Sequence, residues 1–375
     1  MTRPAPFRIL LAASLLLAGV TPAGALLNLD GTRNQIFVFG SVAYAYNSNM
    51  FAEANARSDY TVTAQVGGEW QRRAGIITVD STAKVDFVRY GEYTDEDTIN
   101  PNFAVKFNKD TGRTTGSFNL QAYRETRSDS AVNLRTSSWN FPVALNVKYP
   151  INEKFYTTSN TGYVRRTFSD SQNLVDYSDF TEGVDLYYVY TSKLDLLAGY
   201  RIRLAETSLD GRSTDHWFNV GATGGIFSKM SGTLRFGYQF RKLEGGGRYG
   251  QFNVSGAVNW PLTRKVVLSL ALNRDFNTIA TGASVDSTSA SLRATYAFSR
   301  KLDFDSTVAV GTNDFLAVNT AGREDTYFSW DVGARYRMND HLNVGASVSY
   351  IQNWSSLDRA DYDNHGITVD VSSRY

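Results

Sequence analysis

The sequence predicts an all-β protein, a transmembrane antiparallel up-and-down β-barrel of about eighteen strands preceded by a cleaved signal peptide. Three observations predict it. Apolar and polar residues alternate with a period of two along nearly the whole chain, which places each set on its own face of a sheet. Short and long links alternate between these runs, as in outer-membrane barrels. The first 25 residues have the pattern of a secretory signal.

The composition agrees with strands and tight turns. The 375 residues include 22 Tyr, 22 Phe and 30 Gly but only 7 Pro, a mixture that suits β-structure better than helices. There is no Cys, which excludes disulfides and thiolate metal sites. The formal net charge of +1 leaves no basic excess that would indicate a nucleic-acid partner.

The N-terminus is expected to be a signal peptide over residues 1–25, followed by a barrel over residues 26–375. Arg3 and Arg8 form a basic start, and Ala23-Gly24-Ala25 is a small-residue cleavage site. The apolar run 9–20 between them is too short for a membrane-spanning helix. No long apolar run follows, so the mature protein is either a soluble exported protein or a membrane β-barrel.

The clearest hairpin lies between Tyr249 and Phe276, around the short turn 261–264. Two alternating runs joined by a short polar turn form an antiparallel hairpin. The same unit recurs along the chain. It gives eighteen strand-like segments, over residues 34–47, 59–70, 76–90, 102–108, 114–125, 137–149, 155–168, 179–190, 194–207, 215–227, 232–242, 250–260, 265–276, 287–298, 302–313, 326–338, 342–354 and 365–375.

Charged residues indicate which face meets lipid. In segment 232–242, Arg235 and Arg241 share the face opposite Phe236. An Arg that faces lipid at mid-membrane costs about 2–4 kcal/mol, so the charged set is expected to face a wet lumen. In a soluble sandwich the apolar set would be buried instead. The predicted lumen-lining residues are Arg201, Arg203, Arg235, Arg293, Asp303, Asp305, Asp331, Arg335 and Arg337.

Three segments fit the pattern less well. Segment 155–168 has no clear apolar face, and segment 102–108 is short. Pro142 removes a hydrogen-bond donor early in segment 137–149. Loss of one hairpin would leave sixteen strands, and this is the alternative architecture.

Both ends of the chain are expected on the short-turn side of the barrel. A long link follows the first strand, and an even strand count returns the C-terminus to the same side, which is periplasmic in outer-membrane barrels. The last strand keeps its alternation to Tyr375, as in the closing strands that the barrel-assembly machinery recognises. We therefore expect the outer membrane of a Gram-negative bacterium, with membrane lipid and lipopolysaccharide as neighbours.

The run Tyr44-Ala45-Tyr46-Asn47-Ser48-Asn49-Met50-Phe51, followed by Arg57-Ser58-Asp59-Tyr60, resembles the opening of the putative β-barrel porin-2 family. Many members of that family carry Asp at the position of Asn47. The resemblance implies an outer-membrane barrel, often linked to exopolysaccharide secretion together with a periplasmic polysaccharide-export protein. It implies no catalytic residues, ligand residues or cofactor.

The mixture of charges on the lumen face favours a polar pathway over a strong cation or anion filter. Sixteen to eighteen strands leave an aqueous channel. Together with what the family resemblance implies, this lumen leads us to expect a passive conduit for exopolysaccharide. The alternatives are a general diffusion porin for small solutes and a structural or adhesive surface barrel.

Neither an enzyme nor a metal site is predicted. His216 follows Asp215, and His365 lies close to Asp363, at the outer rim. Outer-membrane proteases and lipases use Asp, His or Ser at the rim, but such neighbourhoods are common in polar loops. The acidic cluster over residues 92–97 has the oxygen ligands that suit Ca²⁺ but not the spacing of a known Ca²⁺ loop.

Overall fold

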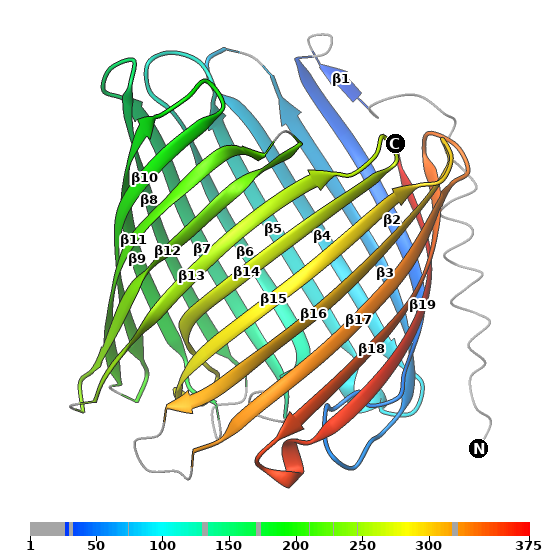
Figure 1. The fold of residues 1–375 in the computed structure, drawn as a ribbon. Coiled ribbons are helices and arrows are strands. Elements are labelled where there is room, and N and C mark those ends of the chain that lie inside the picture. The colour runs from blue at the N-terminus through cyan, green and yellow to red at the C-terminus, as the bar shows by residue number, and fades with distance from the viewer. Residues whose placement is uncertain are drawn as a thin grey trace, which may run out of the picture.

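Eighteen strands close into one antiparallel barrel (Figure 1). β19 pairs with β2, with Val371 opposite Val42, and every other barrel strand pairs with its neighbours in the chain. The prediction of eighteen strands is confirmed, and the sixteen-strand alternative is wrong. The computed structural model describes residues 27–29, 33–73, 75–129, 134–169, 174–209, 211–227, 229–245, 247–316 and 322–375. The expected signal peptide, residues 1–25, lies outside the described residues.

The barrel strands are long, and a short strand β1, Leu27–Leu29, pairs with β2 from outside the ring. The ring is formed by β2 Asn34–Asn47, β3 Asp59–Arg72, β4 Thr78–Tyr90, β5 Thr98–Lys109, β6 Thr115–Asp129, β7 Leu134–Pro150, β8 Phe155–Phe168, β9 Tyr177–Val189, β10 Leu194–Thr207, β11 Arg212–Phe227, β12 Met230–Leu243, β13 Arg248–Pro261, β14 Val266–Thr278, β15 Ser284–Ala297, β16 Leu302–Leu316, β17 Glu324–Arg337, β18 Leu342–Ser355 and β19 Tyr362–Arg374.

Helical structure among the described residues is limited to two short 3₁₀ turns in the links. These are η1, Thr94–Glu96, and η2, Asp358–Ala360. Within the described ranges no helix is long and apolar enough to cross a membrane.

The strands extend further at the long-link end than the apolar pattern predicts. β6 continues to Asp129 and β7 begins at Leu134, where a link over 126–136 was predicted. A ladder of backbone hydrogen bonds needs no apolar face where the sheet leaves the membrane. Alternation of apolar residues therefore stops before the pairing does.

The segments that fitted poorly are complete strands. β8 pairs with β7 and β9 along its length although it has no clear apolar face. Pro142 pairs with Val164 of β8 but lies in a gap of the β6–β7 ladder, between the pairs Leu120–Val143 and Tyr123–Asn140. Because Pro has no N–H to donate, the ladder is interrupted where Pro142 lies.

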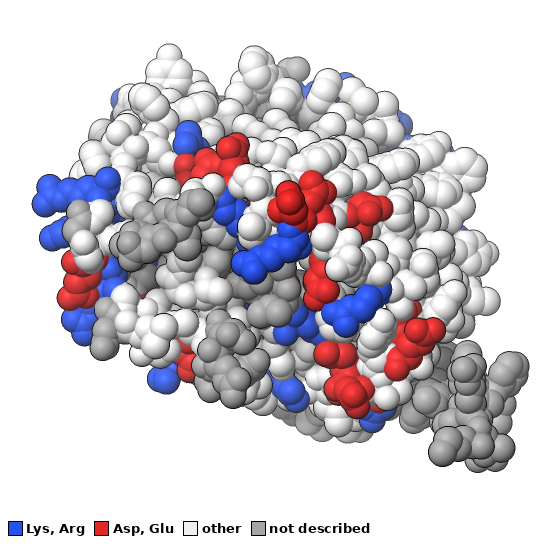
Figure 2. All heavy atoms as spheres, turned by 90° about the horizontal axis from the view of Figure 1, so that it is seen from below, with Lys and Arg blue, Asp and Glu red and all other residues white. Residues whose placement is uncertain are grey.

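Both ends of the barrel chain lie at the short-turn end (Figure 1). The backbone N–H of Tyr375 donates to the carbonyl of Val38 at 2.8 Å, and the N–H of Val38 donates to the carbonyl of Tyr375 at 2.9 Å. Figure 2 views the opposite, long-link end, where basic and acidic side chains gather together.

The apolar face of the wall points outward. Leu204, Phe236 and Trp330 are exposed on the outside of the ring. In a soluble sandwich these side chains would be packed between two sheets. An exposed apolar wall around a charged interior is the arrangement of a barrel in a membrane.

Candidate functional site

The wall of the barrel splits between β13 and β14 toward the long-link end. These two strands pair only from Ser255–Asn273 to Pro261–Val267. β14 continues to pair with β15 as far as Thr278–Ser284, while the outer half of β13 remains with β12. We call residues 274–288 the folded hairpin, because this outer part of β14 and β15 separates from β13 and bends inward while β15 stays paired with β16 as far as Ser284–Leu316.

Side-chain hydrogen bonds span the split in place of the backbone ladder. Asn253 of β13 donates from Nδ2 to the carbonyl of Arg274 at 2.5 Å. Gln251 of β13 donates to Asp286 at 2.7 Å and accepts from Arg274 at 3.2 Å. Backbone groups at a split edge need other partners, and these polar side chains provide some of them.

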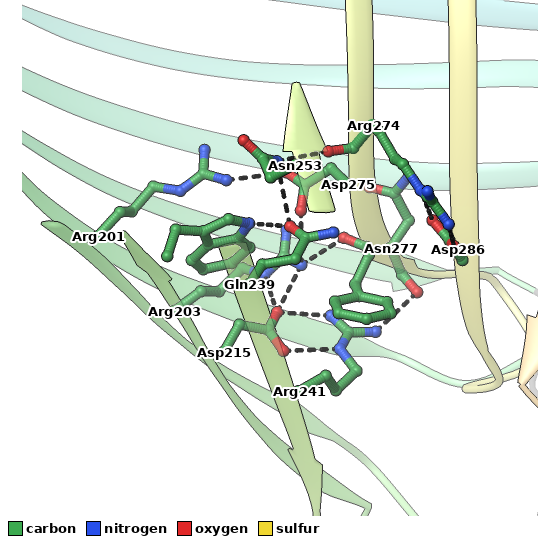
Figure 3. Close-up of polar contacts among 12 residues, drawn as sticks. Arg201, Arg203, Asp215, Gln239, Arg241, Asn253, Arg274, Asp275, Asn277 and Asp286 are labelled. Atoms are coloured by element: carbon green, nitrogen blue, oxygen red, sulfur yellow. Dashed lines mark hydrogen bonds and ion pairs between the residues drawn. The ribbon is translucent and has the colours of Figure 1, made fainter. Parts of the chain in front are cut away.

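The folded hairpin lies against the lumen faces of β10 and β12 (Figure 3). Arg201 of β10 donates to Asp275 at 3.1 Å, and Arg241 of β12 donates to the carbonyl of Asn277 at 3.0 Å. Arg203 also donates to the carbonyl of Phe276. Neighbouring strands lie about 4.8 Å apart. If the hairpin stayed in the wall, the four spacings between β10 and β14 would place these strands about 19 Å apart. The hairpin therefore narrows the lumen.

A buried carboxylate holds two of these arginines. Asp215 of β11 accepts from Arg203 at 2.6 and 2.8 Å and from Arg241 at 2.7 Å twice. Together with Arg201, these residues and the inward Asp179 and Asp275 make three arginines and three aspartates, so the cluster has no formal net charge. Charge-assisted bidentate pairs fix geometry strongly.

Trp217 packs against the arginines of the cluster. Its side chain is completely buried, and its indole N–H donates to Gln239. The guanidinium groups of Arg201 and Arg203 lie 3.9 and 4.9 Å from the centre of one of its rings. A cation held over an aromatic face is attracted by the ring quadrupole. Trp217 therefore orients two of the three arginines that contact the folded hairpin.

The tip of the folded hairpin reaches the link between β8 and β9. The N–H of Val175 donates to the carbonyl of Ala280 at 2.7 Å. Phe168, Leu174 and Ala280 form a buried apolar cluster at this contact. Six of the eighteen strands, β9 to β14, separate the two links along the wall, so the contact joins parts of the rim that lie a third of the ring apart.

The first long link, residues 48–58, folds over the same end of the barrel. Phe51 is buried, packs edge-on against Tyr93 with ring centres 5.3 Å apart, and lies 3.7 Å beneath the guanidinium of Arg57. The hydroxyl of Ser128 on β6 donates to the carbonyl of Met50. The residues that carry the family resemblance thus build a link that crosses the mouth from β2–β3 to β6.

The predicted lumen residues fall into two groups. Arg201, Arg203 and Arg235 take part in ion pairs around the narrowed region, where Arg235 binds Asp185 at 2.8 Å. The other six lie on β15–β17. There Arg293 and Asp305 are 3.6 Å apart, and Arg337 pairs with Asp303. Asp331 and Arg335 are on the same strand, β17, as Arg337.

The sequence singled out Asp215 only as the neighbour of His216 and Arg241 only as a lumen-facing residue. It did not point to Trp217, Gln239, Asn253, Asp275 and Phe276. Continued alternation placed Gln239 and Arg241 on the lumen face, but it gave neither a partner. The split cannot be found from alternation, because a strand that bends inward keeps its period of two. The missing signal is a change in pairing, which leaves no mark on the residue pattern.

The structure separates one of the two neighbourhoods of Asp and His and keeps the other together. Asp215 faces the lumen, whereas His216 contacts Tyr200 on the outer face, with its Nδ1 2.7 Å from the tyrosine hydroxyl. His365 lies 3.1 Å from Asp363, and both side chains are exposed. Adjacent residues of a strand point to opposite faces, which separates Asp215 from His216.

The acidic link over residues 92–97 is engaged by arginines and backbone groups. Glu96 pairs with Arg135 at 2.8 Å, and Asp97 lies 3.3 Å from Arg89. Among the described residues there is no group of three or more His, Asp or Glu positioned to hold a metal ion.

The barrel has the fold of outer-membrane porins. A BenF-like porin from Pseudomonas fluorescens Pf-5 superposes with a TM-score of 0.52 at 11% identity, over 92% of this chain and 99% of that chain. Pseudomonas aeruginosa OpdK, solved with vanillate, gives a TM-score of 0.50 at 12% identity, over 91% and 99% of the two chains. Identities this low show a shared fold alone.

The family resemblance is also confirmed. Residues 209–375 match the model of the family described as "Putative beta-barrel porin 2". This match covers the C-terminal strands, whereas the motif recognised in the sequence lies in the N-terminal ones. A bacterial polysaccharide outer membrane secretin gives a TM-score of only 0.40 at 8% identity, over 90% of this chain and 98% of that chain, and carries no argument. No curated protein matches the chain.

Proposed function

We propose that this protein is an outer-membrane channel that acts as a passive conduit for exopolysaccharide. The observation that supports it best is a lumen whose charges are compensated in pairs. Arg235 makes two hydrogen bonds to Asp185 at 2.8 and 2.9 Å. Arg274 likewise pairs with Asp286 at 2.8 Å. A polar passage without a net charge exerts no strong preference for either sign of ion, and it suits a neutral, hydrated cargo.

The proposal assigns a role to each end of the barrel. The short-turn end would face the periplasm and receive the cargo from a polysaccharide-export protein. The long-link end would face the outside of the cell. Membrane lipid and lipopolysaccharide would surround the wall, and the barrel-assembly machinery would insert it through the closing strand, β19.

A deletion strain tests this function. Loss of the protein should reduce polysaccharide at the cell surface and increase it in the periplasm, and expression of the intact protein should restore export. Polysaccharide is measured in the washed-cell, medium and periplasmic fractions. Unchanged amounts in all three fractions would reject the conduit.

A general diffusion porin for small solutes is the second candidate. It is favoured by the folded hairpin and the link over residues 48–58, which narrow the lumen and suit small solutes better than a polymer. Planar bilayers separate the two functions. A steady conductance on the order of a nanosiemens, as expected of an open aqueous channel, favours the porin. A channel that is closed at rest favours the conduit.

A further inference from the structure

We propose that a hollow in the lumen wall binds an uncharged sugar unit, an inference that rests on the proposed transport of saccharides and names where the cargo is held. The hollow has a volume of about 460 Å³ and is lined by residues of β7 to β14. Small-molecule sites in proteins typically have volumes of roughly 300–1,000 Å³. The wall curls here because the folded hairpin meets β10.

Asparagine and glycine alternate across the strands that form the hollow. Asn219 of β11 lies between Gly199 of β10 and Gly237 of β12, and the next residue in this row is Asn253 of β13. On the other side, Asn160 of β8 is paired with Gly183 of β9. The space over Gly183 is open, since the nearest atom to an added Cβ would be Cγ of Arg201 at 3.6 Å, whereas the carboxylate of Asp185 lies over Gly199. The row therefore presents amides with open space beside Asn160 and a carboxylate at Gly199.

Several of these polar groups have no hydrogen-bond partner within the protein. In the part of the chain that the structure describes, the side chains of Asn160, Asn273 and Ser255 make no hydrogen bond. The Oδ1 atom of Asn219 is buried and also lacks a partner. An amide offers two donors and an acceptor, and a hydroxyl offers both functions. This is the pattern that the hydroxyl groups of a sugar complement.

The charged side chains around the hollow are already paired with one another. Arg235 is held by Asp185, and Arg201 is held by Asp275 at 3.1 Å, which gives two arginines and two aspartates. A charged ligand would find no net opposite charge and would lose part of its hydration. A neutral polyhydroxylated ligand keeps its hydrogen bonds and pays no such cost. This contrast selects a neutral sugar over a sugar acid.

The position of the hollow also fits a transport path. Asn273 is the last residue of β14 before the folded hairpin, and the ion pair Arg201–Asp275 forms the outer edge of the hollow. A sugar held there would lie directly on the short-turn side of the narrowing. It would be placed for passage through the constriction.

Calorimetry on the purified full-length protein in detergent tests the site. Maltose and cellobiose, two neutral disaccharides, are the probes, and gluconate is the charged control. Each should be titrated into the wild type and the double variant Asn160→Ala/Asn273→Ala. Loss of one net hydrogen bond weakens binding about fivefold, so the double variant should bind at least that much more weakly. Asn108→Ala, an inward amide of β5 outside the hollow, should bind like the wild type.

The proposal is overturned if neither disaccharide binds, or if gluconate binds as tightly as the disaccharides. It is also overturned if the double variant Asn160→Ala/Asn273→Ala binds a disaccharide as tightly as Asn108→Ala does. The substituted side chains line open space, and native β-sheet in the circular dichroism spectrum confirms that each variant is folded. Binding is measured without transport. Saccharide binding with normal export in the deletion strain would reject the conduit and keep the site. Failed export in the deletion strain, with no saccharide binding by the purified protein, would support the conduit and reject the site.

Discussion

Arg241 of β12 donates two hydrogen bonds to Asp215 of β11, from Nε to Oδ1 and from Nη2 to Oδ2, both at 2.7 Å. The two side chains are 0% and 1% exposed. Removal of one partner from a buried pair leaves a charge without compensation, which costs far more than the intact pair contributes. The carboxylate of Asp215 thus controls the stability of the narrowed region.

The substitution Asp215→Asn should destabilise the barrel strongly. It leaves Arg203 and Arg241 without their shared counter-charge, at a cost of about 3–5 kcal/mol. Urea unfolding in lipid vesicles, followed by tryptophan fluorescence, measures the change. Asp305→Asn is the matched control, because its pair with Arg293 is half exposed and exposed pairs contribute only about 0–1 kcal/mol. Equal losses in the two variants would contradict this account of the cluster.

A disulfide should join the tip of the folded hairpin to the loop between β8 and β9. The chain has no cysteine of its own. In the double variant Val175→Cys/Ala280→Cys the two backbones are in hydrogen-bond contact at 2.7 Å, within the range in which a disulfide can form. Oxidation followed by electrophoresis detects the link. The pair Val175→Cys/Thr312→Cys should not link, since Thr312 lies on β16. Absence of the disulfide in Val175→Cys/Ala280→Cys, or its formation in the control pair, would contradict this contact.

Gly199→Ala should be harmful, and Gly183→Ala should be tolerated. A Cβ atom at Gly199 would overlap the carboxylate of Asp185, which must then leave Arg235. At Gly183 the nearest atom to an added Cβ is Cγ of Arg201 at 3.6 Å, an ordinary contact. Overpacking typically costs about 1–3 kcal/mol. Urea midpoints of the two variants should differ accordingly, and equal midpoints would disprove the steric argument.

Arg235→Gln should make the channel prefer cations. The change leaves the carboxylate of Asp185 in the lumen without its counter-charge, and a fixed negative charge attracts cations to a pore. The reversal potential under a KCl gradient measures the preference, and it should move toward the potassium equilibrium potential. Arg300→Gln, in a short turn between β15 and β16, should leave it unchanged. A shift toward anions in Arg235→Gln would refute the pairing.

Spin labels should report different solvents on the two faces. A label at Phe236 or Leu268 is expected to be accessible to oxygen, which concentrates in lipid, and protected from a water-soluble nickel chelate. A label at Ser291, on the lumen face of β15, should show the reverse. Alternate residues of a strand face opposite sides of the wall. Nickel accessibility at all three positions would argue against insertion in a membrane.

Period-two alternation found most strands of the ring, and β8, which has no clear apolar face, was predicted together with them. The bounds of β2, β8 and β10 agree with the predicted segments to the residue. The apolar face could be assigned because an Arg on the lipid side is too costly, so that Arg235 and Phe236 fix the orientation of β12. Strand ends were predicted less well, since the outer ladders continue beyond the apolar band.

The site could be predicted only in part. Arg201, Arg203 and Arg235 were identified as facing inward, but their partners come from strands up to four positions away. Which strands meet across a lumen depends on where the wall bends. The bend follows from the end of β13–β14 pairing at Ser255–Asn273, which the residue pattern of the two strands does not reveal.

The folded hairpin has a practical consequence for anyone who would use this barrel as a nanopore. A pore narrowed by a separate loop can be widened by deletion of that loop. Here the obstacle is part of the wall, and its removal would leave a slit between the outer halves of β13 and β16. Widening would instead require that the outer halves of β13 and β14 pair with each other. A ladder of backbone hydrogen bonds would then replace the side-chain hydrogen bonds from Gln251 and Asn253.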